Sequence, residues 1–470
     1  SGLGLVPGGV AAREWESEFD DAEDLYAHWV QMRARLMDVA KLAAASAPAP
    51  ACALAAQAVA GAVRVVEPMP EAPGAAAAME GACSVLESVC SPVTAGGAGA
   101  PVHRAPGARA ELGKALDAVL GLAPTRAPAL AVQEARALQC FGPLGANEPA
   151  VAAALLDRLF RGLGALPASD VAAGAASVRR PGWKGAAREV QVARQRMCSA
   201  VTNVCSAAAA SLGPHLGALA GQVDAMGLQG TEHGAVCEAA LAVAAAESPT
   251  RAAEVLRWMV GPVRARWDPA PPDLLQLYSG PSQNAARWGL FHDVQLVERA
   301  WRRAPVASDP RADTYAAANE ELAGWALPAL LGVVRRVHWL WTAEGRDAMG
   351  ALGLAPALAL SPEERAAHLS MGGLRAHAVL SAGGGGAAPG ETPEAKDVRD
   401  HLRGLRESLY QSLGAAAAHM PHALYGSPGA EVAVGGAVLS YMGAMEPRHM
   451  CSAVRKVLQP AIACCPTPAR

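Results

Sequence analysis

The chain has 470 residues, of which 52% are hydrophobic and only 4% aromatic, and its formal net charge is −3. This length is too great for one ordinary compact domain unless the chain is a repeat array. A charge this close to zero excludes a global field that attracts nucleic acid, so any RNA contact has to come from a local basic surface.

Apolar residues recur three and four positions apart along most of the chain, and clusters of Pro and Gly interrupt them, which is typical of amphipathic helices with short breaks. In the segment 187–223, for example, an apolar stripe ends at Leu212-Gly213-Pro214 and a second helix follows. In chain order the expected helices are 21–45, 51–66, 74–90, 109–122, 127–140, 149–163, 187–212, 216–226, 231–246, 250–267, 271–278, 285–303, 314–341, 362–380, 396–419, 428–445 and 447–464.

No segment has a strand pattern, so the expected fold class is all-α. Paired helices of about 15–20 residues, repeating about every 40 residues, are typical of HEAT-type units. The sequence therefore predicts an α-solenoid of antiparallel helix pairs that forms a superhelical arc. We expect one solenoid over residues 1–470, with flexible Gly/Ala/Pro-rich insertions near 91–108, 164–184 and 381–392.

Most of the ten cysteines lie on apolar helical stripes, and none forms a CxxC pair with a matching second pair. This pattern indicates reduced core residues rather than a metal site or a disulfide framework. We find no run of about 20 residues apolar enough to cross a bilayer and expect no membrane insertion. The N-terminus has no signal-peptide pattern. The chain starts at Ser1 rather than at a methionine, so we expect a fragment of a larger protein.

One basic cluster spans the end of the second insertion and the first turns of the next helix. Its residues are Arg179, Arg180, Lys184, Arg188, Arg194 and Arg196. One interpretation is an exposed loop and the solvated face of a helix. The other is a rim that contacts RNA phosphates, since the planar arginine fork matches phosphate oxygens.

Three other segments were considered both as structural features and as functional ones. The acidic run from Glu14 to Asp24 is either a solvated lead-in to a helix or a contact for a basic partner. The segment Val333–Trp341 is expected to be an amphipathic core helix with arginines at its edge. In the segment Glu446–Pro466, His449 and Cys451 lack a second ligand pair nearby, which argues against a metal.

Enzyme signatures are missing from the chain: there is no phosphate-binding glycine loop followed by Lys-Ser/Thr, no HExxH and no Gly-x-Ser-x-Gly. We therefore expect no catalytic residues, no bound cofactor and no metal. Scattered carboxylates on solenoid faces are a poor basis for acid–base catalysis.

Several segments, taken in order, resemble the exportin-5 family of nuclear export receptors, called HASTY in plants, within the importin-β superfamily. They are SEFDDAEDLYAHWVQMRARLMDVAKLAA, AREVQVARQRMCSAVTNVCS, AAEVLRWMVGPVRARW, LAGWALPALLGVVRRVHWLW, AKDVRDHLRGLRESLYQSLG and MEPRHMCSAVRKVLQPAIACCP. The last two are most similar to the plant branch. The specificity lies in the order and spacing of these blocks.

The resemblance implies a central-to-C-terminal piece of a HEAT-repeat export receptor that shuttles between nucleus and cytoplasm. It implies Ran-GTP as a partner, so that GTP enters only through Ran, together with nucleoporins. It implies structured RNA (hairpin or double-stranded) or RNA–protein cargo, as in microRNA precursors. The basic cluster above matches part of the family's basic inner face. The alternative is an α-solenoid scaffold or an organellar RNA-binding repeat protein that is not linked to Ran.

Overall fold

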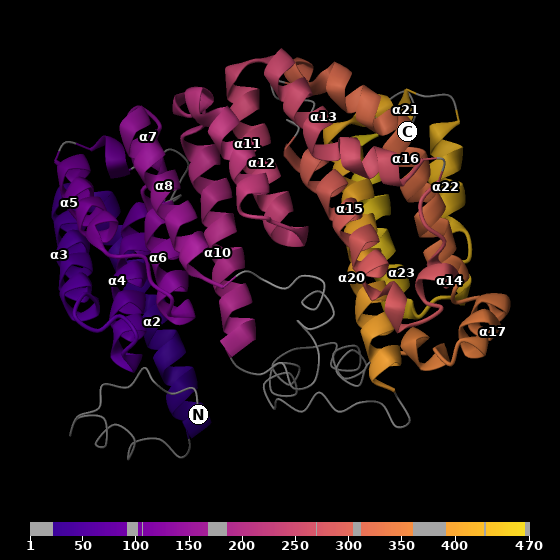
Figure 1. Cartoon of the computed structure of the whole chain (residues 1–470), viewed down its shortest axis with the longest axis horizontal. Helices are drawn as coiled ribbons and strands as arrows, with labels where there is room; N and C mark the ends of the chain where they lie inside the picture. Colours follow the sequence, from indigo (N-terminus) through magenta and orange to yellow (C-terminus); the bar gives the residue numbers. More distant parts are fainter. Residues whose placement is uncertain are drawn as a thin grey trace. The chain divides into compact units, whose positions relative to one another are not determined.

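A computed structural model describes residues 22–91, 102–105, 107–167, 186–268, 270–303, 312–360, 392–426 and 429–465. Every regular element within these residues is a helix, which confirms the all-α prediction (Figure 1). The chain divides into two compact units, and the described residues change from unit 1 to unit 2 after Met226.

Unit 1 consists of helices that alternate between two rows. Its elements are α2 (Ala22–Ser46), α3 (Pro48–Val66), α4 (Pro73–Cys90), η1 (Val102–Arg104), α5 (Ala108–Gly121), α6 (Pro128–Cys140), α7 (Gly142–Gly145), α8 (Pro149–Ala165), α10 (Ala186–Ala207), η2 (Ala209–Ser211), η3 (Gly213–His215) and α11 (Leu216–Ala225). In the first row α2, α4, α6 and α10 pack in succession, and in the second row α3, α5 and α8 do so. Neighbours in sequence, such as α3 with α4 and α8 with α10, pack across the rows.

Unit 2 repeats this alternation. Its elements are α12 (Gly230–Glu247), α13 (Pro249–Arg266), α14 (Leu274–Leu277), η4 (Pro281–Gln283), α15 (Asn284–Arg303), α16 (Ala312–Trp339), α17 (Ala343–Ala351), η5 (Ala355–Leu358), α20 (Pro393–His419), α21 (Pro421–Tyr425), α22 (Ala430–Leu439), η6 (Met442–Ala444), α23 (Pro447–Ala453), η7 (Val454–Leu458) and α24 (Gln459–Cys464). The first row is α12, α15, α20 and then the segment from α23 to α24, and the second row is α13, α16 and α22.

Two rows of alternating helices define an α-solenoid, in which each helix pair contacts mainly its neighbours. The predicted solenoid of helix pairs is therefore confirmed within each unit. The predictions that residues 1–470 form one solenoid and that it winds into one superhelical arc stay predictions.

Several helices, among them α3, α4, α6 and α13, begin at a proline, because the missing N–H of a first-turn proline is not needed by the helix. Pro149 and Pro447, expected from the sequence to occupy such positions, do start α8 and α23. Expected helix ends were less accurate. The helix predicted to reach Leu212 ends at Ala207 and passes into 3₁₀ turns, and the helix predicted for 428–445 is interrupted at Tyr441, whose φ is +61°.

The predicted insertions lie largely outside the described residues, as does the predicted helix 362–380. The flanking residues that are described are structured. Val102 is buried in η1, which contacts α5, and α8 continues through Ala165, two residues beyond its predicted end. The flexibility of the remaining residues stays a prediction.

The core of unit 1 is built from small side chains. On α3, which packs against both α4 and α5, the fully buried residues are Cys52, Ala55 and Val59. A Cβ added at Gly142 of α7 would lie 3.1 Å from the Ala207 side chain of α10. Alanine and glycine at these positions let neighbouring helices pack closely, as the alanine-rich composition implies.

Helix α3 is long and apolar enough to cross a membrane by length and composition, with a mean hydropathy of 1.5 over 18 residues. The expectation that no segment has this property was therefore wrong. The helix packs between α4 and α5, however, and 39% of that window is buried inside unit 1. Its hydropathy comes from the alanine and valine residues that build the core, and one such helix is weak evidence for insertion.

Candidate functional site

The predicted basic cluster is only partly described by the structure. Arg179, Arg180 and Lys184 lie outside the described residues. Arg188 and Arg196 are exposed on α10, separated by eight residues, or about 12 Å along the helix axis. These two guanidinium groups are accessible to a partner.

Arg194 does not belong to this exposed set, and its assignment to a phosphate-contacting rim was wrong. The side chain is 4% exposed, and Nη1 donates to the carbonyl oxygens of Leu163 at 3.2 Å and Pro167 at 3.3 Å. The last carbonyl groups of a helix lack intrahelical partners, and a cation is favourable there. Arg194 therefore joins the C-terminal end of α8 to α10.

The other segments singled out from the sequence have mixed outcomes. The acidic run from Glu14 to Asp21 lies outside the described residues, and its last two residues, Glu23 and Asp24, lie in the first turn of α2. The segment 333–341 is a core helix with arginines at its edge, as predicted. Arg335 is exposed, and the Arg336 guanidinium lies 4.1 Å from the Trp339 ring centroid. His338 is fully buried, and its Nε2 lies 2.7 Å from the Tyr410 hydroxyl.

The cysteines are free thiols, and half of them are buried. Burial raises the pKa of Cys52 to about 12, and burial also raises the pKa of Cys83 to about 12. A thiol with so high a pKa is protonated at neutral pH and is a poor nucleophile. These two residues therefore serve as core side chains.

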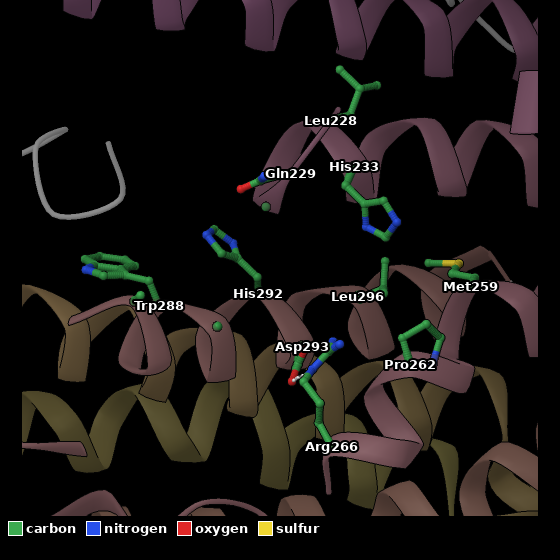
Figure 2. Close-up of a pocket in the computed structure, with 13 residues that line it drawn as sticks. Leu228, Gln229, His233, Met259, Pro262, Arg266, Trp288, His292, Asp293 and Leu296 are labelled. Carbon is green, nitrogen blue, oxygen red and sulfur yellow. Dashed lines mark hydrogen bonds and ion pairs between the residues drawn. The ribbon is translucent and has the colours of Figure 1, made fainter. Parts of the chain in front are cut away.

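A pocket of about 480 Å³ lies in unit 2 between α12, α13 and α15 (Figure 2). Figure 2 shows His292 extending from α15 toward Gln229, with the Trp288 ring to one side of it and His233 on the other. Gly230, at the start of α12, has a φ of +55°, and a Cβ there would lie 2.8 Å from Nε2 of His292. Only glycine combines this backbone conformation with the close approach of the imidazole ring.

The charged side chains that line this pocket, Arg266 and Asp293, form an ion pair with each other. Arg266 Nε donates to Oδ2 of Asp293 at 3.1 Å, and Trp267 Nε1 donates to the same oxygen at 3.2 Å. Burial lowers the pKa of His292 to about 4, with smaller contributions from His233 and Arg299, so the imidazole is neutral at pH 7. The lining therefore includes the neutral imidazole of His292 and the indole of Trp288. These groups are suited to non-covalent binding.

Many arginines of unit 2 are also committed to internal ion pairs. Glu238 of α12 is 3% exposed and pairs with Arg299, Arg302 and Arg303 of α15. A buried carboxylate held by three guanidinium groups ties neighbouring first-row helices together. These arginines are therefore structural, although their sequence pattern resembles a basic patch.

Sequence reasoning missed a second basic cluster. Arg448, Arg455 and Lys456 of the C-terminal segment lie in one pocket with Arg403 and Arg406 of α20. About 45 positions separate the two groups along the chain, so no local pattern reveals the juxtaposition. The only sequence signal is that each segment carries several cations on a helix expected to have a neighbour.

The fold and these surfaces define the class of protein. It is an α-solenoid whose exposed basic side chains form local clusters. A family model described as the exportin-5 family matches residues 9–470, and the chain belongs to that family. The chain is also similar to Protein HASTY 1 of Arabidopsis thaliana, with 26% identity over 301 residues. That match covers 59% of this chain and 24% of the length of the Arabidopsis protein.

Proposed function

We propose that this chain acts in a karyopherin-type nuclear export receptor. It binds RNA or RNA–protein cargo together with Ran-GTP in the nucleus, releases it after GTP hydrolysis and passes the pore through nucleoporins. The preferred cargo is a short double-stranded or hairpin RNA. The observation that carries this proposal is the family match over residues 9–470. The chain itself needs no cofactor, because GTP is held by Ran.

The physical properties of a solenoid suit this role. The deep, narrow major groove of A-form RNA cannot be read by side chains, so a receptor recognises stem shape and phosphates instead. Stacked helix pairs present a long surface, on which Arg188 and Arg196 are accessible. Because Ran-GTP and cargo each favour one conformation of the solenoid, losing one partner weakens the other.

The test is a pull-down of the full-length protein with Ran locked in its GTP form, with and without hairpin RNA. We expect RNA retention to require Ran-GTP, and Ran retention to increase when RNA is present, because coupling between two sites is reciprocal. Binding of RNA without Ran, or no binding of Ran, would instead favour a scaffold or an organellar RNA-binding repeat protein.

Reversing the charge at both Arg188 and Arg196 to Glu is expected to weaken hairpin binding. It should also lower the slope of log K against log salt by about one for each lost phosphate contact. The measurement is a fluorescence-anisotropy titration at several salt concentrations. The matched control is Arg64→Glu with Arg126→Glu, since both residues are exposed in unit 1. Equal affinity of the two double variants would remove Arg188 and Arg196 from the site.

Arg194→Glu is not part of this test, because a buried carboxylate facing the carbonyl oxygens of α8 would destabilise unit 1 itself. Loss of RNA binding in such a variant would not identify a contact. Circular dichroism of the exposed-residue variants should match that of the unmodified chain.

A further inference from the structure

Two cysteines of unit 1 end neighbouring helices of the first row. Cys90 is the last residue of α4, and Cys140 is the last residue of α6, a helix that packs directly against α4. Both thiols are half-buried, unlike those of Cys52 and Cys83, which are 0% exposed. A half-buried thiol is positioned by its surroundings and can still be reached by a small molecule.

The contacts between α4 and α6 align the ends of the two helices. Sγ of Cys83 donates to the Gln133 carbonyl oxygen at 3.1 Å. One turn further along, Nε of Arg136 donates to Oε1 of Glu87 at 2.8 Å. The two helices therefore run in the same direction, with partners 49 or 50 positions apart in sequence. Continuing this alignment by one more turn reaches the last residue of each helix, so the two terminal cysteines lie opposite each other.

The backbones of α4 and α6 are close as well as aligned. The Cys83 side chain is short, so its hydrogen bond to a main-chain oxygen means that the α6 backbone itself lies against α4. Ala137 of α6, which is 0% exposed, places no more than a methyl group in the helix packing. A disulfide requires such close packing, because its two Cα atoms lie about 4.4–6.8 Å apart.

The two terminal thiols also interact with each other. The pKa of Cys140 is raised well above its usual value, first by a hydrogen bond with the Cys90 thiol and then by burial. Sγ of Cys140 in addition donates to the Arg136 carbonyl oxygen of the preceding turn at 3.2 Å. The fold thus brings together two sulfur atoms that lie 50 positions apart in the sequence.

We propose that Cys90 and Cys140 form a reversible disulfide, which a small disulfide such as oxidised glutathione introduces by thiol–disulfide exchange. The Cys90 thiolate attacks one sulfur of glutathione disulfide, so that a mixed disulfide forms and one glutathione thiolate leaves. Cys140 then loses its proton and attacks the Cys90 sulfur, which releases the second glutathione thiolate. The protein gives up two electrons and two protons, and glutathione disulfide becomes two thiols.

The link changes unit 1 mechanically. A solenoid bends through small displacements between neighbouring repeats, so a covalent bond between α4 and α6 removes this freedom at one position. The raised pKa of Cys140 affects the rate of closure, since a protonated thiol is a poor nucleophile. The equilibrium instead depends on how well the folded unit holds the two sulfur atoms together.

The test is a titration of the full chain with reduced and oxidised glutathione at a fixed millimolar total, followed by alkylation and peptide mass spectrometry. We expect a cross-linked peptide pair containing Cys90 and Cys140, which dithiothreitol removes. It should form at a proportion of oxidised glutathione at least about tenfold lower than modifies the exposed Cys451, because its second step is intramolecular. Cys90→Ser should abolish the cross-link, and the matched control Cys451→Ser should leave it unchanged.

Hydrogen exchange measures whether the link fits the native packing. Amides of α4 and α6 should exchange at least about tenfold more slowly in the oxidised chain than in the reduced chain, whereas those of α12 and α13 in unit 2 should not change. Mixed disulfides without a cross-link, a preferred link between other cysteines, or no added protection would overturn the proposal. These measurements on the unmodified chain decide the outcome even if Cys90→Ser lowers the melting temperature.

Discussion

Replacing Arg158 with methionine is expected to destabilise unit 1 by about 3–5 kcal/mol, because it leaves a buried carboxylate without its counter-charge. Arg158 of α8 is fully buried and pairs with Glu134 of α6, which is 2% exposed. Its Nη2 also donates to the carbonyl oxygen of Ala123 at 3.2 Å. Protection of α6 and α8 amides from hydrogen exchange measures the effect in the full chain.

The double variant Arg158→Met with Glu134→Leu is expected to recover most of the lost stability or to exceed that of the unmodified chain, by up to about 4 kcal/mol. For Arg158 and Glu134, the cost of desolvation already outweighs their mutual attraction. Nε and Nη1 of Arg158 have no hydrogen-bond partner. Burial raises the pKa of Glu134 to about 7 although Arg158 lowers it. An apolar pair of similar volume avoids this cost.

Two controls complete this comparison of the single and double variants. Arg161→Met removes an exposed ion pair with Asp157 one helical turn away and should change stability by less than about 0.5 kcal/mol. The penalty of the single Arg158 variant should shrink as pH falls from 9 to 7 and change little below pH 7, because the pKa of Glu134 is about 7 beside Arg158 and higher without it. A double variant as unstable as the single variant would show that the pair is a net source of stability.

Acidification from pH 6.5 to pH 4.5 is expected to unfold unit 2, because three of its histidines are buried as neutral rings. Burial lowers the pKa of His338 to about 4, that of His401 to about 3 and that of His449 to about 2. The unfolded chain takes up protons below about pH 6.5, whereas the folded unit does not. The stability contributed by each ring is therefore complete above pH 6.5 and is lost as pH falls toward the folded pKa.

The free energy of unfolding of unit 2 is expected to depend steeply on pH. As pH falls through this range, each histidine lowers the free energy of unfolding by about 1.4 kcal/mol per pH unit. The three together with His292, whose pKa burial also lowers to about 4, lower it by about 5 kcal/mol per pH unit. The hydrogen bonds explain why protonation is resisted at His401. Nε2–H donates to the Arg287 carbonyl oxygen at 2.8 Å and Nδ1 lies 3.0 Å from the Tyr278 hydroxyl, so a second ring proton would displace the tyrosine donor.

Tryptophan fluorescence in urea is a suitable probe, since Trp29 is the one tryptophan of unit 1 among the described residues and the others described belong to unit 2. His401→Gln should lower overall stability but reduce the slope by about 1.4 kcal/mol per pH unit. His215→Gln, a change at a half-buried histidine of unit 1, should leave the slope of unit 2 unchanged. Equal urea midpoints at pH 7.5 and pH 5 would contradict the expectation.

Local sequence patterns determined the helices and their buried faces. In the segment 187–223, for which the sequence predicts an apolar stripe, Ala193, Met197, Val201 and Ala208 are at most 1% exposed. Periodicity predicts such features because a residue three or four positions along a helix lies on the same face, whichever neighbour covers it. First-turn prolines marked helix starts for the same local reason.

The tertiary structure alone decided which arginines are accessible. Arg194 follows a buried alanine and donates hydrogen bonds to carbonyl oxygens at the C-terminal end of α8, whereas Arg196 on the same helix is exposed. The pocket lined by Arg406 and Arg455 combines cations from α20 and η7, which only the packing of separate helices brings together. A guanidinium group serves equally well as a helix cap, an ion-pair partner or a phosphate ligand. Its role therefore depends on the groups that the fold places within hydrogen-bond reach, and those come from distant parts of the chain.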